Sequence, residues 1–91
     1  MSNRVKIGVL GAGTWGIALA RMLCNAGNDV SVWSAVETEI DMLSSSRKHP
    51  NLPGVELPDR IVYTKDIADI CADKDILVFI KEFFCFFLVF F

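Results

Sequence analysis

Six consecutive residues near the amino terminus could do chemistry as a unit, because they match the spacing G-x-G-x-x-G. They are Gly11, Ala12, Gly13, Thr14, Trp15 and Gly16. In a dinucleotide-binding turn the first glycine permits a tight bend, the second lets the backbone approach a pyrophosphate, and the third lets the helix pack closely on the strand. The amides that begin the helix then face the phosphate charge. The spacing predicts a site for NAD or NADP, and a glycine-rich turn of purely structural use is the alternative.

A second candidate position lies where the adenosine ribose of such a cofactor would sit. The fingerprint usually has an acidic residue there, at the end of the second strand and about 20 residues on. In this chain the strand ends in Trp33, Ser34 and Ala35. The Ser34 hydroxyl could serve a ribose hydroxyl or a 2′-phosphate, and without a carboxylate at this point NADP is not repelled. Glu37 is the nearest acid, and we expect it to be a solvated residue of a helix's first turn.

The other reactive side chains predict neither a catalytic residue nor a metal site. His49 is the only histidine, and its Pro-rich surroundings place it at the surface. The cysteines Cys24, Cys71 and Cys85 are odd in number and lack C-x-x-C spacing, which favours reduced thiols in a cytoplasmic protein. The amino terminus shows no export signal. Basic residues are scattered in a chain of net charge −2, so we expect no nucleic-acid or membrane-surface partner.

The elements that must position the glycine motif form a strand–helix–strand unit. The nearly continuous apolar run Val5–Leu10 predicts a buried parallel strand, and the β-rich run Asp29–Trp33 predicts its partner. Between them a helix starts at Thr14 and ends at Gly27, which supplies a left-handed cap. The apolar residues expected to share its buried face are Trp15, Leu19, Met22, Leu23 and Ala26.

The alternation continues beyond this unit. Helical spacing of Val36, Ile40 and Leu43 predicts a more exposed helix, and a loop over 49–58 holds all three prolines. We then expect strands at Ile61–Tyr63 and Asp75–Phe79, with a short helical stripe between them formed by Ile67, Ile70 and Cys71. The pattern predicts an α/β fold: a Rossmann-like, doubly wound parallel sheet that is incomplete at about four strands.

The last residues differ in kind from the rest. Six of the seven phenylalanines lie in the run Phe83–Phe91, which has neither helical nor alternating polarity and is too short to span a bilayer as a helix. We therefore divide the chain into a partial dinucleotide-binding domain, residues 1–79, and a hydrophobic tail, residues 80–91, that suggests a frameshift or truncation. The tail and the exposed edge of an incomplete sheet make self-association an expectation.

The residues of the glycine motif and its surroundings are specific enough to suggest a family. The run Lys6–Ala20 resembles the opening of bacterial NAD(P)-dependent glycerol-3-phosphate dehydrogenases, with Trp15 and the following Ala-Leu-Ala as the distinctive part. The run Val30–Trp33 adds to the resemblance, and Asn51–Pro58 is similar to that family's L-P-G-x-x-L-P loop. The resemblance covers Arg4 to Phe79.

This resemblance implies hydride transfer between a nicotinamide and the carbinol carbon of glycerol 3-phosphate, which gives dihydroxyacetone phosphate and feeds phospholipid synthesis. It places the ribose near Ser34, where Ala35 replaces a basic residue or histidine common in the family, and it assigns the pyrophosphate turn to Gly11, Gly13, Thr14, Trp15 and Gly16.

The family's catalytic lysine and helical substrate domain have no match, and Lys81 lies too close to the fourth strand to be that lysine. We therefore expect no catalytic residue and no turnover by this chain alone. A non-catalytic dinucleotide-binding module, or the cofactor domain of another dehydrogenase such as ketopantoate reductase or hydroxyacyl-CoA dehydrogenase, remains an alternative.

Overall fold

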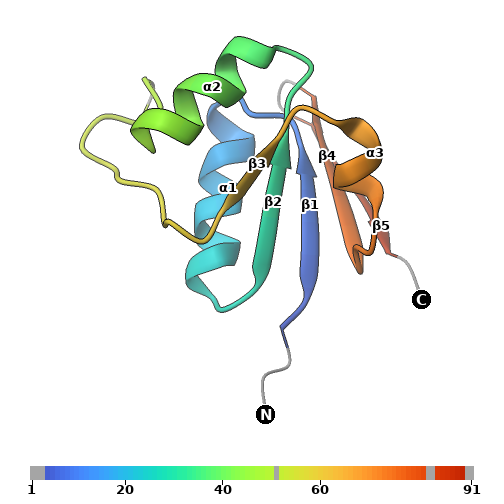
Figure 1. Cartoon of the computed structure of the whole chain (residues 1–91). Coiled ribbons are helices and arrows are strands. Elements are labelled where there is room, and N and C mark those ends of the chain that lie inside the picture. The colour runs from blue at the N-terminus through green and yellow to red at the C-terminus, as the bar shows by residue number, and fades with distance from the viewer. Residues whose placement is uncertain (1–3, 51, 82–83, 90–91) are drawn as a thin grey trace.

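Strands and helices alternate along the chain in the computed structural model, which describes residues 4–50, 52–81 and 84–89 (Figure 1). The strands are β1 (Lys6–Leu10), β2 (Asp29–Trp33), β3 (Val62–Thr64), β4 (Ile76–Lys81) and β5 (Phe84–Val89). The helices are α1 (Thr14–Asn25), α2 (Glu37–Ser46) and α3 (Ile67–Cys71). The four predicted strands and three predicted helical segments are all present, with ends shifted by a residue or two.

The described strands form one sheet in the order β3-β2-β1-β4-β5. Strands β1 to β4 are parallel, as predicted, and Val9 of β1 is level with Val32 of β2 and Val78 of β4. The chain runs outward from β1 through β2 to β3 and then crosses to the other side of β1 to form β4. The carboxyl ends of β1 and β4 therefore mark a topological switch point, which is where ligands bind in open α/β sheets.

Two separate apolar clusters cover the two faces of the sheet, so the sheet is doubly wound. In Figure 1, α1 lies behind the sheet and α3 in front of it. The larger cluster joins α1 and α2 to one face and includes Val9, Ile17 and Leu43, while the smaller one joins Ile70 of α3 to Leu10 and Leu77. Adjacent residues of β1 thus pack into opposite clusters, because successive side chains of a strand point to opposite faces of the sheet.

The buried face of α1 is not the one predicted from the sequence. Trp15 and Met22, two of the large residues assigned to it, are 61% and 59% exposed. The residues buried against the sheet are instead Gly16, Ile17, Ala20 and Cys24, and Leu19 and Leu23 are only partly buried. Three of these four residues are small, and Trp15 and Met22 are exposed instead. The predicted cap is confirmed, since Gly27 follows α1 with a φ of +101°.

The loop between α2 and β3 packs against the core, which overturns the expected surface position of His49. Leu57 is fully buried, and its N–H donates to the Arg47 carbonyl at 2.9 Å. Leu57 and Ile61 join the larger apolar cluster, and Leu52 packs against it. Because these apolar residues hold the loop down, His49 is only 7% exposed.

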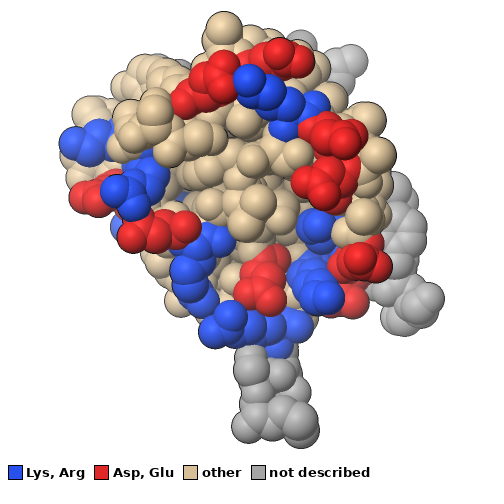
Figure 2. All heavy atoms as spheres, viewed as in Figure 1, with Lys and Arg blue, Asp and Glu red and all other residues tan. Residues whose placement is uncertain are grey.

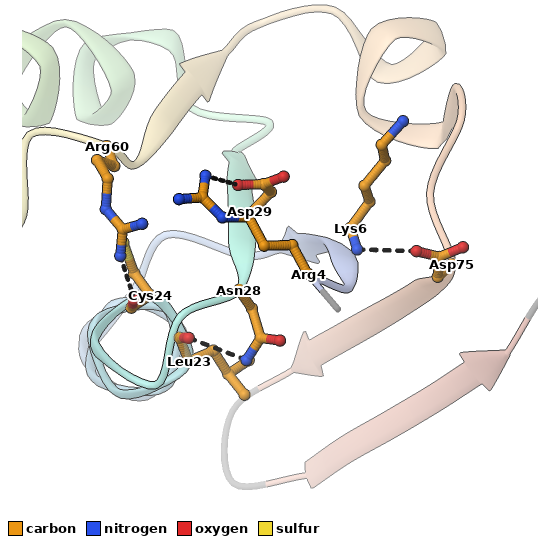
Figure 3. A network of polar contacts seen from close by, with 8 residues as sticks. All are labelled: Arg4, Lys6, Leu23, Cys24, Asn28, Asp29, Arg60 and Asp75. Carbon is orange, nitrogen blue, oxygen red and sulfur yellow. Dashed lines mark hydrogen bonds and ion pairs between the residues drawn. The ribbon is translucent and has the colours of Figure 1, made fainter. Parts of the chain in front are cut away.

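Polar contacts tie the starts of strands to neighbouring segments (Figure 3). The Lys6 N–H donates to the Asp75 carboxylate at 2.9 Å, and the Asp75 N–H donates to the Lys6 carbonyl at 2.8 Å. Arg60, which precedes β3, donates from its guanidinium to the Cys24 carbonyl in the last turn of α1 at 2.6 Å. These contacts fix β1 relative to β4, and α1 relative to the strand β3 that lies beyond β2.

Strand β5 is an element that the sequence did not predict. It pairs antiparallel with β4, with Lys81 opposite Phe84, and so forms one edge of the sheet. The described residues do not include Phe83, Phe90 and Phe91, and they do not include the side chain of Cys85. The other two cysteines are free thiols, of which Cys24 is buried and Cys71 is exposed. The origin suggested for the tail stays a prediction. In the described part of the chain, no helix is long and apolar enough to cross a membrane.

Candidate functional site

A cavity of about 870 Å³ opens at the carboxyl ends of β1, β2 and β4, at the switch point of the sheet. Its walls come from the ends of these strands, the turn after β1 and the first turns of α2 and α3. The lining residues are Leu10, Gly11, Ala12, Gly13, Trp33, Ser34, Ala35, Glu39, Ile67, Phe79 and Ile80. Three of the predicted site residues, Gly11, Gly13 and Ser34, are among them.

Gly11 makes the tight bend by which the chain leaves β1. Its φ of +134° is a conformation that side chains rarely allow, and an added Cβ would lie 2.9 Å from the Ile80 carbonyl oxygen. Its N–H donates to the Trp33 carbonyl at 2.8 Å, which joins the turn to the end of β2. Gly11 therefore holds the turn against both neighbours of β1.

Gly16 and Gly13 have opposite surroundings. A Cβ on Gly16 would clash with the Gly11 carbonyl oxygen, so the glycine is needed for α1 to pack against the turn. A Cβ on Gly13 would have no heavy atom within 4 Å. Gly13 is also in an extended conformation, with a φ of −72°, that any residue can adopt. Neither the fold nor the backbone conformation requires a glycine here, but the space in front of it is clear.

Helix α1 begins beside this open space. Gly13 is its N-cap residue, and the Ile17 N–H closes the first turn by donating to the Gly13 carbonyl at 3.0 Å. No acidic residue lies in that first turn, so no side chain there offsets the positive end of the helix dipole. Thr14, Trp15 and Gly16 form the turn but do not line the cavity, and Trp15 faces outward.

The ribose end of the predicted site contains a carboxylate that sequence reasoning missed. Ser34 is 5% exposed, and its hydroxyl donates to Glu39 Oε1 at 2.6 Å and accepts from the Val36 N–H at 3.0 Å. Glu39 lines the cavity, whereas Glu37 is exposed, as predicted, and does not. Glu39 is the third residue of α2, a position from which acidic side chains typically reach back over the helix start, and that spacing was the available signal.

One ion pair joins α2 to the loop after β3. The Lys65 ammonium lies 2.7 Å from the Asp41 carboxylate of α2, and this hydrogen bond raises the pKa of Lys65. The Lys65 carbonyl accepts from the indole N–H of Trp33 at 3.0 Å, which places the loop after β3 next to the end of β2. Figure 2 shows acidic and basic side chains interspersed around an uncharged centre on the face of the molecule that Figure 1 presents to the viewer.

Comparison with known proteins places this chain within a family. The family model described as the NAD-dependent glycerol-3-phosphate dehydrogenase N-terminus matches residues 6–82, which include β1 to β4 and every residue that lines the cavity. The chain belongs to this family. The match supports the resemblance seen in the sequence over the other dehydrogenase families considered there.

Individual relatives agree with the family match. A glycerol-3-phosphate dehydrogenase (NAD(P)+) of Lactobacillus delbrueckii subsp. bulgaricus is 62% identical over 74 residues, which cover 81% of this chain and 22% of that protein. The enzyme of the same name from Agathobacter rectalis is 49% identical over 74 residues, or 80% of this chain and 22% of that protein.

A crystal structure of glycerol-3-phosphate dehydrogenase from Coxiella burnetii superimposes with a TM-score of 0.76 at 25% identity, covering 84% of this chain and 24% of that one. The chain thus spans about a fifth of the length of the relatives it matches.

Proposed function

We propose that this chain binds a nicotinamide dinucleotide in the cavity at the switch point, with the pyrophosphate over Gly13 and the adenosine ribose toward Ser34. The open space in front of Gly13 carries the proposal. Gly11 and Gly16 are enclosed by protein atoms that account for their lack of a side chain, whereas at Gly13 no protein atom does so. A glycine facing empty space at a helix N-terminus leaves room for a ligand's phosphates.

The charge around Gly13 supports an anionic ligand. The start of α1 presents the positive end of a helix dipole and no carboxylate in its first turn. The apolar residues that line the rest of the cavity, Leu10, Ile67, Phe79 and Ile80 among them, suit the uncharged rings of a dinucleotide. The cavity thus offers each part of the cofactor a matching surface.

The reaction that goes with this site is hydride transfer between the nicotinamide and the carbinol carbon of glycerol 3-phosphate, with the bound cofactor supplying or accepting the hydride. Among the described residues that line the cavity, Glu39 alone is ionisable, and it lies at the ribose end beside Ser34. The described residues therefore bind and orient the cofactor, and residues 1–91 alone bind it without turnover.

Titration calorimetry of the chain with NAD, under reducing conditions, tests this proposal. Gly13→Val should abolish binding, because its side chain would occupy the space of the pyrophosphate. The variant should still fold, since Gly13 has an ordinary φ and nothing within 4 Å of an added Cβ.

Ala26→Val, at the far and exposed end of the same helix, is the control and should bind like the unmodified chain. Equal affinities of Gly13→Val and the unmodified chain would show that the pyrophosphate lies elsewhere.

Two further proposals concern the location of the chain and its self-association. A cytoplasmic location fits the free thiols of Cys24 and Cys71. Self-association of the isolated chain fits the two edges of the sheet, β3 and β5, because an edge strand carries backbone groups without a strand partner. Sedimentation velocity over a range of concentrations tests the second feature, and a constant monomer would contradict it.

A further inference from the structure

We propose that Glu39 makes this site select NAD over NADP. The inference deepens the proposed function, because it assumes that the adenosine ribose lies at the end of β2. It differs from the expectation drawn from the sequence, in which Ser34 received either a ribose hydroxyl or a 2′-phosphate and no carboxylate was present to repel NADP.

The hydrogen bonds of Ser34 carry the first step. A serine hydroxyl has one proton, and Ser34 gives it to Glu39 Oε1 over 2.6 Å while accepting from the Val36 N–H at 3.0 Å. Ser34 is almost wholly buried, so this arrangement is enclosed by the protein. With its proton committed, Ser34 has no donor left for a ligand, and the group that meets the ribose is the Glu39 carboxylate.

The chemistry of that carboxylate carries the second step. An ionised carboxylate only accepts hydrogen bonds, and the 2′-hydroxyl of an adenosine ribose can donate one. A 2′-phosphate offers acceptor oxygens and a charge of about −1.5 to −2, as a phosphate monoester does at neutral pH. Glu39 thus provides a partner for NAD, and both a mismatched hydrogen bond and a like charge for NADP.

The charges around Glu39 carry the third step, because a nearby cation could reverse this preference. The described residues that line the cavity include no lysine or arginine, and the residue that follows Ser34 is Ala35. Lys65 is engaged with Asp41 at 2.7 Å. No described cation at this end of the cavity is therefore placed to receive a 2′-phosphate.

A purely structural use of Glu39 would produce the same bond to Ser34. A carboxylate near the start of α2 stabilises that helix, and it fixes the chain that leaves β2. A structural role alone predicts a loss of stability in a Glu39 variant and no change in the ratio of the two cofactor affinities. The ratio therefore separates the two roles.

The experiment is titration calorimetry of the full 91-residue chain with NAD and with NADP, as unmodified protein and as Glu39→Gln. Glutamine keeps the length of the side chain and an oxygen that can accept from Ser34, but it removes the charge. The unmodified chain should bind NAD at least about tenfold more tightly than NADP, and Glu39→Gln should reduce that ratio by about tenfold, as expected for the removal of one like charge near a phosphate.

The matched control is Glu37→Gln, which removes the same charge from the same turn of α2 at an exposed position outside the cavity lining. It should leave the ratio within about twofold of the unmodified chain, because an exposed charge is screened by solvent. Chemical denaturation of each variant separates any loss of stability from the change in affinity.

The outcomes distinguish the inference from the function on which it rests. Equal affinities for NAD and NADP in the unmodified chain, or a ratio unchanged by Glu39→Gln, would overturn the role of Glu39 and leave dinucleotide binding intact. A ratio that falls equally in Glu37→Gln would also overturn it, because the effect would then belong to net charge. Binding of neither cofactor by the unmodified chain would overturn both proposals.

Discussion

Tyr63 is the one described residue with a buried side-chain oxygen or nitrogen that has no hydrogen-bond partner among the described residues. Its hydroxyl lies on β3 beside the larger apolar cluster. Burial, with a smaller electrostatic contribution from Cys24 and an opposing one from Arg47, raises the pKa of Tyr63 to about 12 from its ordinary 10.0. The native chain therefore holds this proton at a pH at which the unfolded chain has lost it.

The raised pKa predicts a loss of stability in alkali. Between pH 10 and about 12 the unfolded state binds fewer protons at Tyr63 than the native state does, so the free energy of unfolding falls as pH rises. Tyr63→Phe should remove this part of the fall. At neutral pH it should leave the free energy of unfolding unchanged or raise it by about 1 kcal/mol, because an unsatisfied polar group is removed.

Tyr63 is the only tyrosine, so tyrosinate absorbance reports its ionisation directly. The midpoint should lie near pH 12 in the native chain and near pH 10 in denaturant. Coincident midpoints in the two solvents would show that the hydroxyl is solvated in the native state.

Among the elements, α1 depends on a residue far along the chain for its C-terminal end. No basic residue lies in its last turn, and the cation that meets the helix dipole there is Arg60, through its bond to the Cys24 carbonyl. Arg60→Met keeps most of the apolar stem and removes the charged donor. We expect the free energy of unfolding to fall by about 1–2 kcal/mol, the usual size for a charge-assisted bond at a helix end.

Urea denaturation measures this change. Arg21→Met is the matched control, because Arg21 lies exposed on the same helix and should change the free energy of unfolding by less than about 0.5 kcal/mol. Equal losses in the two variants would mean that the contact with Cys24 contributes nothing to stability.

The elements themselves could be predicted from the sequence, but some of their contacts could not. Local signals include apolar runs such as Val5–Leu10, which predicted a strand, and Gly27, which predicted the end of a helix. The structure confirms both. The buried face of α1 was predicted wrongly because periodicity gives weight to large residues such as Trp15, whereas close packing on a sheet selects Gly16 and Ala20. Which side of a helix meets a sheet depends on residues distant in sequence.

The sequence indicated one part of the candidate site, the glycine turn, and left out two others. The spacing of the glycines indicated the turn, because Gly11 and Gly16 meet local geometric needs, the tight bend after β1 and the close packing of α1 on the turn. The contribution of Glu39 was not predicted, because the dinucleotide-binding pattern has its acidic residue at the end of β2, and the first acid after that strand, Glu37, is exposed. The apolar wall from α3 and β4, including Ile67 and Phe79, requires knowledge of the strand order and could not be read from spacing.

At the scale of the whole molecule, the cavity lies where three strands, a turn and two helices meet, so a ligand there should stabilise the entire fold. NAD present at roughly 100 times its dissociation constant should raise the free energy of unfolding by about 2.7 kcal/mol. For a domain of this size each kcal/mol raises Tm by about 4–8 °C. Thermal melts followed by circular dichroism measure the shift, and Gly13→Val should melt at the same temperature with and without NAD.

An unmodified chain whose Tm is indifferent to saturating NAD would contradict this prediction. A shift of equal size in Gly13→Val would show instead that the stabilising ligand lies away from the turn.

The position of Gly11 determines how much conformational entropy the turn after β1 would lose on binding a ligand. The turn continues β1, donates to the Trp33 carbonyl of β2 and lies against Ile80 of β4, so three adjacent strands hold it in one conformation. A free loop surrenders conformational entropy of about 1–2 kcal/mol for each residue that a ligand orders. This turn is already ordered by the sheet, so a phosphate bound at the helix N-terminus, as proposed, would incur little additional cost for ordering the loop.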